Sequence, residues 1–263
     1  MKNVVVFPKK EISSPVCVIV LTHNRLDVTK EFLSSFLLNT FNKYDLVIVD
    51  NMSTDRTRIF LEYFKYEYND VHLIFLDHNS GVIEGRNEGY ERVKEFHHDY
   101  LIFLDNDQIV QEGWLSQHIN VLNSGYDLVG VDAWTMNDNF RPIRSISNPD
   151  ETFSYVGCGG MIIKREVIEE VGLFDPIFSP MYFEDPDFNF KCHNAGFKIG
   201  WNYKAKINHL AHQTMEIISQ QERRKNFKQN LEKFRNKWKG YKPLRLKQSK
   251  LKVLDDYYYN NCL

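Results

Sequence analysis

Short apolar runs alternate with longer amphipathic stretches along the first hundred residues of this chain. The runs are rich in β-branched and aromatic residues and lie at positions 16–21, 46–49, 71–76 and 100–104. Such continuous hydrophobicity is typical of strands that are buried on both faces. The stretches between them carry apolar residues near helical spacing, which predicts helices at 27–39, 53–66 and 82–96. This alternation indicates βαβ units and an α/β fold with a mostly parallel sheet.

Polar side chains follow three of the predicted strands at the point where each strand ends. They are Thr22-His23-Asn24-Arg25, Asp50-Asn51 and Asp105-Asn106-Asp107. In a doubly wound sheet these strand ends lie at one edge, so their polar groups converge on one cleft. Each loop alone could be an ordinary turn, because Asp and Asn favour turns. The convergence of three such loops is what predicts a binding site.

Asp105 and Asp107 form the most informative of these strand ends. The two carboxylates stand two residues apart, close enough to hold a hard divalent cation against a diphosphate. The alternative is a solvated turn, which is the commoner meaning of such a pair on its own. Motifs elsewhere in the chain are needed to choose between a cation site and a solvated turn.

The composition is globular, with 43% hydrophobic and 14% aromatic residues among 263. The apolar runs are too short to span a bilayer, and the first fifteen residues lack the apolar centre of a signal peptide. Cys17, Cys158, Cys192 and Cys262 stand far apart, without a CxxC pair. This spacing argues against a disulfide framework or a zinc site, and it predicts a cytoplasmic protein.

The charge is unevenly distributed along the chain. Residues 222–252 contain 13 Lys and Arg against two Glu, a net charge of +11, whereas the remainder carries −13. A basic tail on an acidic body favours an anionic partner, such as a membrane surface, nucleic acid or a phosphorylated acceptor. The alternative is a solvated face that balances the body. Apolar residues among the charges predict a helix over 215–238, which could lie on a membrane surface as a peripheral contact or dock on the domain.

The order of the motifs resembles the family 2 glycosyltransferases of the GT-A fold. The resemblance begins with the three strand ends above, and Asn79-Ser80-Gly81 and Gly85-Arg86-Asn87-Glu88-Gly89 lie between the second and third. It continues through the run at 156–165, then Gly172-Leu173-Phe174-Asp175 and Glu184-Asp185-Pro186-Asp187, and covers roughly residues 16–214. It implies a GT-A domain at 1–214, followed by a basic helical extension at 215–263.

The resemblance implies that a nucleotide-sugar donor, most simply a UDP-sugar, binds at these strand ends. Asp50 would bind the base, and the guanidinium of Arg86 suits a phosphate oxygen or a base carbonyl. Each of these residues could equally serve as a cap, a turn or a surface ion pair. The expected donor-binding residues are Thr22, Asn24, Arg25, Asp50, Asn51, Asn79, Gly81, Arg86, Asp105 and Asn106.

The resemblance also implies a metal, Mn²⁺ or Mg²⁺, held by Asp107 and Asp105. Asp107 is the stronger candidate for a direct ligand in this family. A further ligand often comes from a histidine after the last core strand, where His209 fits better than His212. A lone histidine is more often a packing residue.

Inverting transfer needs a base for the acceptor hydroxyl, and the resemblance assigns that role to Asp185. Glu184 would orient the acceptor or Asp185 itself, although Asp185-Pro186 also reads as an ordinary helix start. Gly157, Gly159 and Gly160 interrupt a strand-like run and predict an acceptor-facing surface, with a bulge as the alternative.

The polar segment 134–152 is long for a passive loop and predicts a lid, with Trp134 as a candidate for stacking on a sugar. The predicted function is metal-dependent, inverting sugar transfer to a hydroxyl acceptor. The sequence does not decide whether that acceptor is a glycan, a lipid-linked saccharide, protein or DNA. Two other functions stay open, a nucleotidyltransferase and a non-catalytic sugar-binding protein.

Overall fold

A mixed, mostly parallel sheet of seven strands forms the centre of the protein. The computed structural model describes residues 15–41, 43–68, 71–96, 98–210 and 219–248. The strands lie in the order β12-β6-β11-β4-β1-β2-β3. In chain order they are β1 (Val16–Thr22), β2 (Asp45–Asp50), β3 (Val71–Phe75), β4 (Tyr100–Asp105), β6 (Leu128–Gly130), β11 (Met161–Lys164) and β12 (Ile199–Trp201). Only β11 runs antiparallel to its neighbours in this sheet, so the predicted fold class is confirmed.

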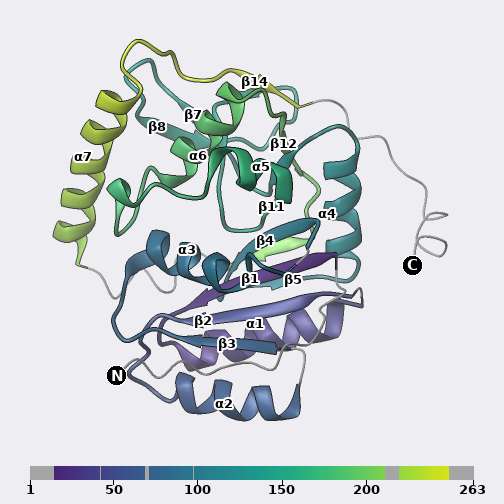
Figure 1. Cartoon of the computed structure of the whole chain (residues 1–263). Helices are drawn as coiled ribbons and strands as arrows, with labels where there is room; N and C mark the ends of the chain where they lie inside the picture. The colour runs from purple at the N-terminus through teal and green to yellow at the C-terminus, as the bar shows by residue number, and fades with distance from the viewer. Residues whose placement is uncertain (1–14, 42, 69–70, 97, 211–218, 249–263) are drawn as a thin grey trace.

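Helices cover both faces of the sheet (Figure 1). Each face of the sheet is apolar and needs covering, because alternate side chains of a strand point to opposite faces. In β1 one face contributes Val16, Val18 and Val20 to one apolar cluster. The other face contributes Cys17, Ile19 and Leu21 to a second cluster. The first cluster takes in α1 (Leu26–Asn39), α2 (Thr57–Glu67) and α4 (Trp114–Asn123). The second takes in α3 (Gly81–Val93), α5 (Arg165–Val171) and α6 (Glu184–Asn194). The predicted third helix ends at Val93, three residues earlier than expected.

Three small sheets surround the central one. The first consists of β10 (Tyr155–Val156), β7 (Ala133–Met136) and β8 (Pro142–Ser145), and the second of β5 (Gln108–Val110) and β13 (Ile207–His209). In the third, β9 (Thr152–Phe153) pairs with β14 (Leu246–Lys247). The polar segment 134–152 is less irregular than expected, because residues 134–136, 142–145 and 152 belong to strands, and its role as a lid stays a prediction.

The C-terminal helix α7 (Gln220–Lys237) lies along the same side of the molecule as α6 (Figure 1). Leu231 and Phe234 are buried in the cluster that also contains α6, and Trp238 follows them into it. Leu231, Phe234 and Trp238 thus dock this basic helix on the domain. None of the helices in the described ranges has both the length and the hydropathy to cross a membrane. The boundary expected near residue 214 falls within 211–218, outside the described residues.

Candidate active site

The three polar strand ends meet at one edge of the sheet, as the sequence predicts. Thr22 and Asp50 are direct neighbours across β1 and β2. Asp105 lies beside Leu21 on the other side of β1. Parallel pairing brings the three loops together, because it aligns the carboxyl ends of β1, β2 and β4.

A buried hydrogen-bond network fixes the loop after β4. Asn106 is almost fully buried, and its Nδ2 donates to Oγ1 of Thr22 at 3.1 Å and to Oγ1 of Thr29 at 3.0 Å. The two threonine hydroxyls lie 2.9 Å apart. Thr22 and Asn106 therefore hold the loop in place, and their contact with a donor stays a prediction.

Two side chains hold Asp105 at the end of β4. Arg86 Nη2 donates to Asp105 Oδ1 at 2.6 Å, and the backbone N–H of Asp105 donates to Gln108 Oε1 at 2.9 Å. A Cβ atom at Gly159 would lie 2.5 Å from Asp105 Oδ2, so any side chain there would displace the Asp105 carboxylate. Arg86 is 4% exposed, and the nearby carboxylates raise its pKa further despite its burial. Its contact with a donor phosphate or base stays a prediction.

Asp107 and His209 are brought together by the two-stranded sheet. The register of β5 and β13 places His209 opposite Gln108, and the N–H of Leu210 donates to the carbonyl of Asp107. His209 Nε2 lies 2.9 Å from Asp107 Oδ1. This bond to Asp107 raises the pKa of His209 to about 9, so the metal-free imidazole is protonated at neutral pH.

Asp105, Asp107 and His209 can each direct one ligand atom into a space where all three atoms lie within 4.8 Å of one another. Two carboxylate oxygens and one imidazole nitrogen suit Mn²⁺ well, and Mg²⁺ through the oxygens. The donor set therefore fits the predicted divalent cation, which would take the place of the proton on His209. The less favoured His212 lies outside the described residues.

The two candidate catalytic acids stand at the start of α6. Burial first, and then the neighbouring Asp185, raise the pKa of Glu184 to about 8. Burial also raises the pKa of Asp185, whose Oδ1 accepts from the N–H of Cys158 at 3.2 Å. Tyr182 and Phe183 precede them with φ of 73° each, a left-handed conformation that such bulky residues rarely adopt. Burial thus raises the pKa of both candidate catalytic acids, Glu184 and Asp185.

Hydrogen bonds join the loops that are expected to bind the donor base. Asp50 is 1% exposed, its carboxylate accepts from the N–H of Ser53 at 3.2 Å, and burial raises its pKa. Asn24 Oδ1 accepts from the N–H of Thr54 at 2.7 Å, which joins the loops after β1 and β2. Arg25 is partly exposed and lies 3.4 Å from Asp27.

Asn51 joins the loop after β2 to the start of α3. Its Oδ1 accepts from the N–H of Ser80 at 2.8 Å, and its Nδ2 donates to the carbonyl of Gly81 at 3.0 Å. Gly81 has φ of 77°, and a Cβ there would lie 2.7 Å from the Pro180 carbonyl oxygen. The exposed Asn79 accepts from the N–H of Gly81 at 3.0 Å. Asn51 and Gly81 thus have clear structural roles, and their donor contacts stay predictions.

The glycine run lies between the two groups of acids. A Cβ at Gly157 would still be 3.9 Å from Asp185 Oδ2, which leaves room on that side, whereas Gly160 has φ of 84° and packs on Val131. Trp134 differs from the other candidates, because its ring stacks on Tyr155 in the small sheet, with ring centroids 6.5 Å apart. Its role in binding an acceptor stays a prediction.

Sequence reasoning missed the part that α7 plays at this site. Asn230 is buried and donates through Nδ2 to the carbonyls of Phe178, Met181 (2.8 Å) and Tyr182 (3.3 Å). One turn of α6 beyond Glu184, Asp187 accepts from Trp238 Nε1 at 2.9 Å and from Lys237 at 2.8 Å. The C-terminal helix, which the sequence suggested was an accessory, therefore holds both ends of the candidate catalytic segment. The only available signal was a polar Asn among the apolar positions of a basic helix.

Comparisons with known proteins agree with this geometry. Residues 17–202 match the model of the protein family described as glycosyl transferase family 2. The chain is 26% identical over 160 residues to TuaG of Bacillus subtilis strain 168, which is named as a glycosyltransferase of teichuronic acid biosynthesis. That alignment covers 57% of this chain and 62% of TuaG. The chain spans less than two thirds of the length of the curated relatives it matches.

Solved structures share the fold. The crystal structure of GalNAc-T7 with UDP, GalNAc and Mn²⁺ matches with a TM-score of 0.64 at 16% identity, over 74% of this chain and 44% of GalNAc-T7. TarS of S. aureus (residues 1–349), in complex with UDP-GlcNAc, matches with a TM-score of 0.53 at 22% identity. This second match covers 72% of this chain and 56% of TarS.

Proposed function

This chain belongs to glycosyl transferase family 2, and we propose that it transfers a sugar from a nucleotide-sugar donor to a hydroxyl group of an acceptor. One observation carries the proposal. Asp105 touches the space at Gly159 that a Cβ would fill, and Asp185 lies beside Gly157, only two residues away along the chain. A candidate metal ligand and a candidate base thus face one short glycine segment, an arrangement that suits transfer between two substrates.

The donor is most simply a UDP-sugar. Asp50 lies at the end of β2, where its buried carboxylate can accept a hydrogen bond from the N–H of a uracil ring. The structures of GalNAc-T7 with UDP and of TarS with UDP-GlcNAc, which share the fold, support this choice. Which sugar is carried depends on a few pocket contacts, which differ among proteins of one fold.

Asp105, Asp107 and His209 would hold Mn²⁺ or Mg²⁺. When bound, the cation neutralises charge on the diphosphate leaving group. The chain itself orients these ligands: Arg86 and Gln108 fix Asp105, and the β5–β13 pairing fixes His209 against Asp107. The presence of Mn²⁺ in the GalNAc-T7 structure supports the proposal.

Asp185 acts as the general base in this proposal. The acceptor oxygen attacks the anomeric carbon as the bond from that carbon to the diphosphate oxygen breaks, and the hydroxyl proton passes to Asp185. Attack opposite the leaving group inverts the configuration. The N–H of Cys158 holds one oxygen of Asp185, and Glu184 would orient the acceptor or Asp185 itself. A placed general base contributes about 10²–10⁴-fold to such a step.

We further propose that the protein works in the cytoplasm, since Cys17, Cys158 and Cys192 are buried free thiols. Its acceptor is a hydroxyl of a glycan or glycoconjugate, in keeping with the teichuronic acid pathway named for TuaG.

The direct test is incubation of the protein with a panel of UDP-sugars and Mn²⁺, followed by measurement of UDP release with and without candidate acceptors. Release of UDP supports transferase chemistry. Release of a sugar 1-phosphate, with transfer of the uridylyl group, would indicate a nucleotidyltransferase instead, and tight donor binding without turnover would indicate a sugar-binding protein.

A further inference from the structure

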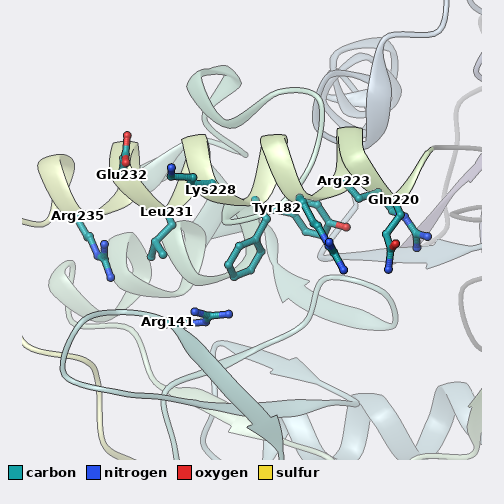
Figure 2. A pocket seen from close by; sticks show the side chains of 10 residues that line it. Arg141, Tyr182, Gln220, Arg223, Lys228, Leu231, Glu232 and Arg235 are labelled. Atoms are coloured by element: carbon teal, nitrogen blue, oxygen red, sulfur yellow. The ribbon is translucent and has the colours of Figure 1, made fainter.

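A pocket with a volume of about 750 Å³ lies between α7 and the turn that joins β7 to β8. This size is within the range of about 300–1,000 Å³ typical of small-ligand sites. Figure 2 shows Arg141 on one side of it, facing the side chains of α7. The residues that line it are Arg141, Tyr182, Gln220, Arg223, Arg224, Phe227, Lys228, Leu231, Glu232 and Arg235.

The lining is strongly cationic. Its charged lining residues are four arginines, one lysine and a single glutamate. Within the described part of the chain, none of these five cations forms an ion pair with a carboxylate. Arg223 Nε is buried and lacks a hydrogen-bond partner among those residues. An unneutralised group of this kind attracts anions, and guanidinium groups suit phosphate and carboxylate oxygens in particular.

The pocket adjoins the catalytic segment. Tyr182, which forms part of its wall, precedes Glu184 by two residues, and two residues of extended chain span at most ~7 Å. The rings of Tyr182 and Phe227 lie 5.7 Å apart and nearly perpendicular, which fixes the wall in place. Asn230 on the same helix holds the carbonyls of Met181 and Tyr182. A molecule in this pocket would therefore lie beside the chain segment that leads to the proposed base.

We propose that this pocket binds an oxyanion, phosphate or carboxylate, carried by a saccharide acceptor close to the hydroxyl that receives the sugar. The inference rests on the proposed transferase function and specifies its acceptor as anionic. Tyr182 and Phe227 supply apolar faces on which a sugar ring can lie, while the arginines hold the charge. The donor site lies at the edge formed by β1, β2 and β4, so the two substrates approach the glycine run from different elements.

The test measures binding of short oligosaccharides to the full chain by titration calorimetry. The probes are tetragalacturonate, a glycerol phosphate tetramer and neutral maltotetraose. We expect either or both anionic probes to bind, with an affinity that falls as salt rises, and maltotetraose to bind much more weakly. The anionic probe that binds identifies the recognised group as carboxylate or phosphate.

The pocket variant R224Q/K228Q removes two exposed cations, and K225Q/K239Q removes two exposed cations of the same region that do not line the pocket. We expect the first to weaken binding of the anionic probe by roughly tenfold or more, because charge-assisted hydrogen bonds are lost. The second should leave it unchanged. R223Q, measured alongside, should weaken binding by itself.

Equal binding of neutral and anionic probes, no binding of either anionic probe, or equal losses in the two double variants would overturn the proposal. Binding of UDP with Mn²⁺ is measured on the same protein. If UDP fails to bind while the anionic probe still responds to R224Q/K228Q, the transferase proposal fails and the anion site stands.

Discussion

Arg86 Nη2 and Asp105 Oδ1 lie 2.6 Å apart in an ion pair that joins helix α3 to the candidate metal site. Arg86 lies on α3 and is almost fully buried, while Asp105 ends β4 and stays partly accessible. The arginine also lies within the electrostatic influence of Asp185 and Glu184. One buried cation therefore balances carboxylates on both sides of the proposed reaction.

Replacing Arg86 should affect stability and donor binding together. We expect R86Q to lower the free energy of unfolding by about 2–4 kcal/mol, because it leaves acids near a buried site without their cation. Donor affinity should fall as well, since Asp105 loses its support. Chemical denaturation and UDP-sugar titration measure the two effects. The control is R92Q on the same helix, where an exposed pair should contribute less than about 1 kcal/mol.

The metal site gives a second prediction. D107N and H209Q each remove one candidate ligand, and we expect both to weaken Mn²⁺-dependent UDP-sugar binding by about tenfold or more while the fold is kept. Metal-independent UDP binding should change little. A normal response of either variant to Mn²⁺ would remove that residue from the ligand set.

Glu184 should make the stability of the protein depend on pH. Its pKa rises from the usual 4.5 to about 8, so between these values the folded protein holds a proton that the unfolded chain has lost. The free energy of unfolding should therefore decrease as pH rises from about 4.5 to about 8. In E184Q this decrease should be smaller, with the largest gain over wild type near pH 8. Urea denaturation across this range measures it, and parallel curves for the two proteins would contradict it.

Asn230 should matter for catalysis although it lies on the C-terminal helix. N230L removes its hydrogen bonds to the segment that leads to Glu184 but keeps a side chain of similar size. We expect lower turnover and a loss of about 1–3 kcal/mol in stability, because buried carbonyls lose their donor. The matched control is N236L, on the exposed side of the same helix. Equal behaviour of the two variants would limit α7 to packing.

Much of the fold could be predicted, because buried parallel strands leave a strong signal in the sequence. The runs that end at Thr22, Asp50 and Asp105 are almost wholly apolar, so their positions and their common edge followed from pattern alone. The family resemblance is also confirmed by the match over residues 17–202. Local composition was less informative at 134–152, where polar residues form a hairpin whose pairing partner, Tyr155, comes later in the chain.

The internal partners of the site residues could not be predicted. Nothing local marks Arg86 as the partner of Asp105, or Asn106 as a residue turned toward Thr29, since these contacts join segments far apart in sequence. The basic tail shows the same limit. Its charge pattern allowed either docking or a membrane surface. Only tertiary packing shows that Leu231 and Phe234 dock on the domain, and contact with a membrane surface stays a prediction.

The central claim is that Asp185 acts on the acceptor and not on the donor, and D185N tests it most directly. Donor affinity is measured by titration with a UDP-sugar and Mn²⁺, and turnover by UDP release at saturating donor and acceptor. We predict donor affinity near that of the wild type and turnover lowered by about 10²–10⁴, as expected for loss of a general base. Loss of donor affinity with turnover retained at saturation would contradict the account and make Asp185 a donor ligand.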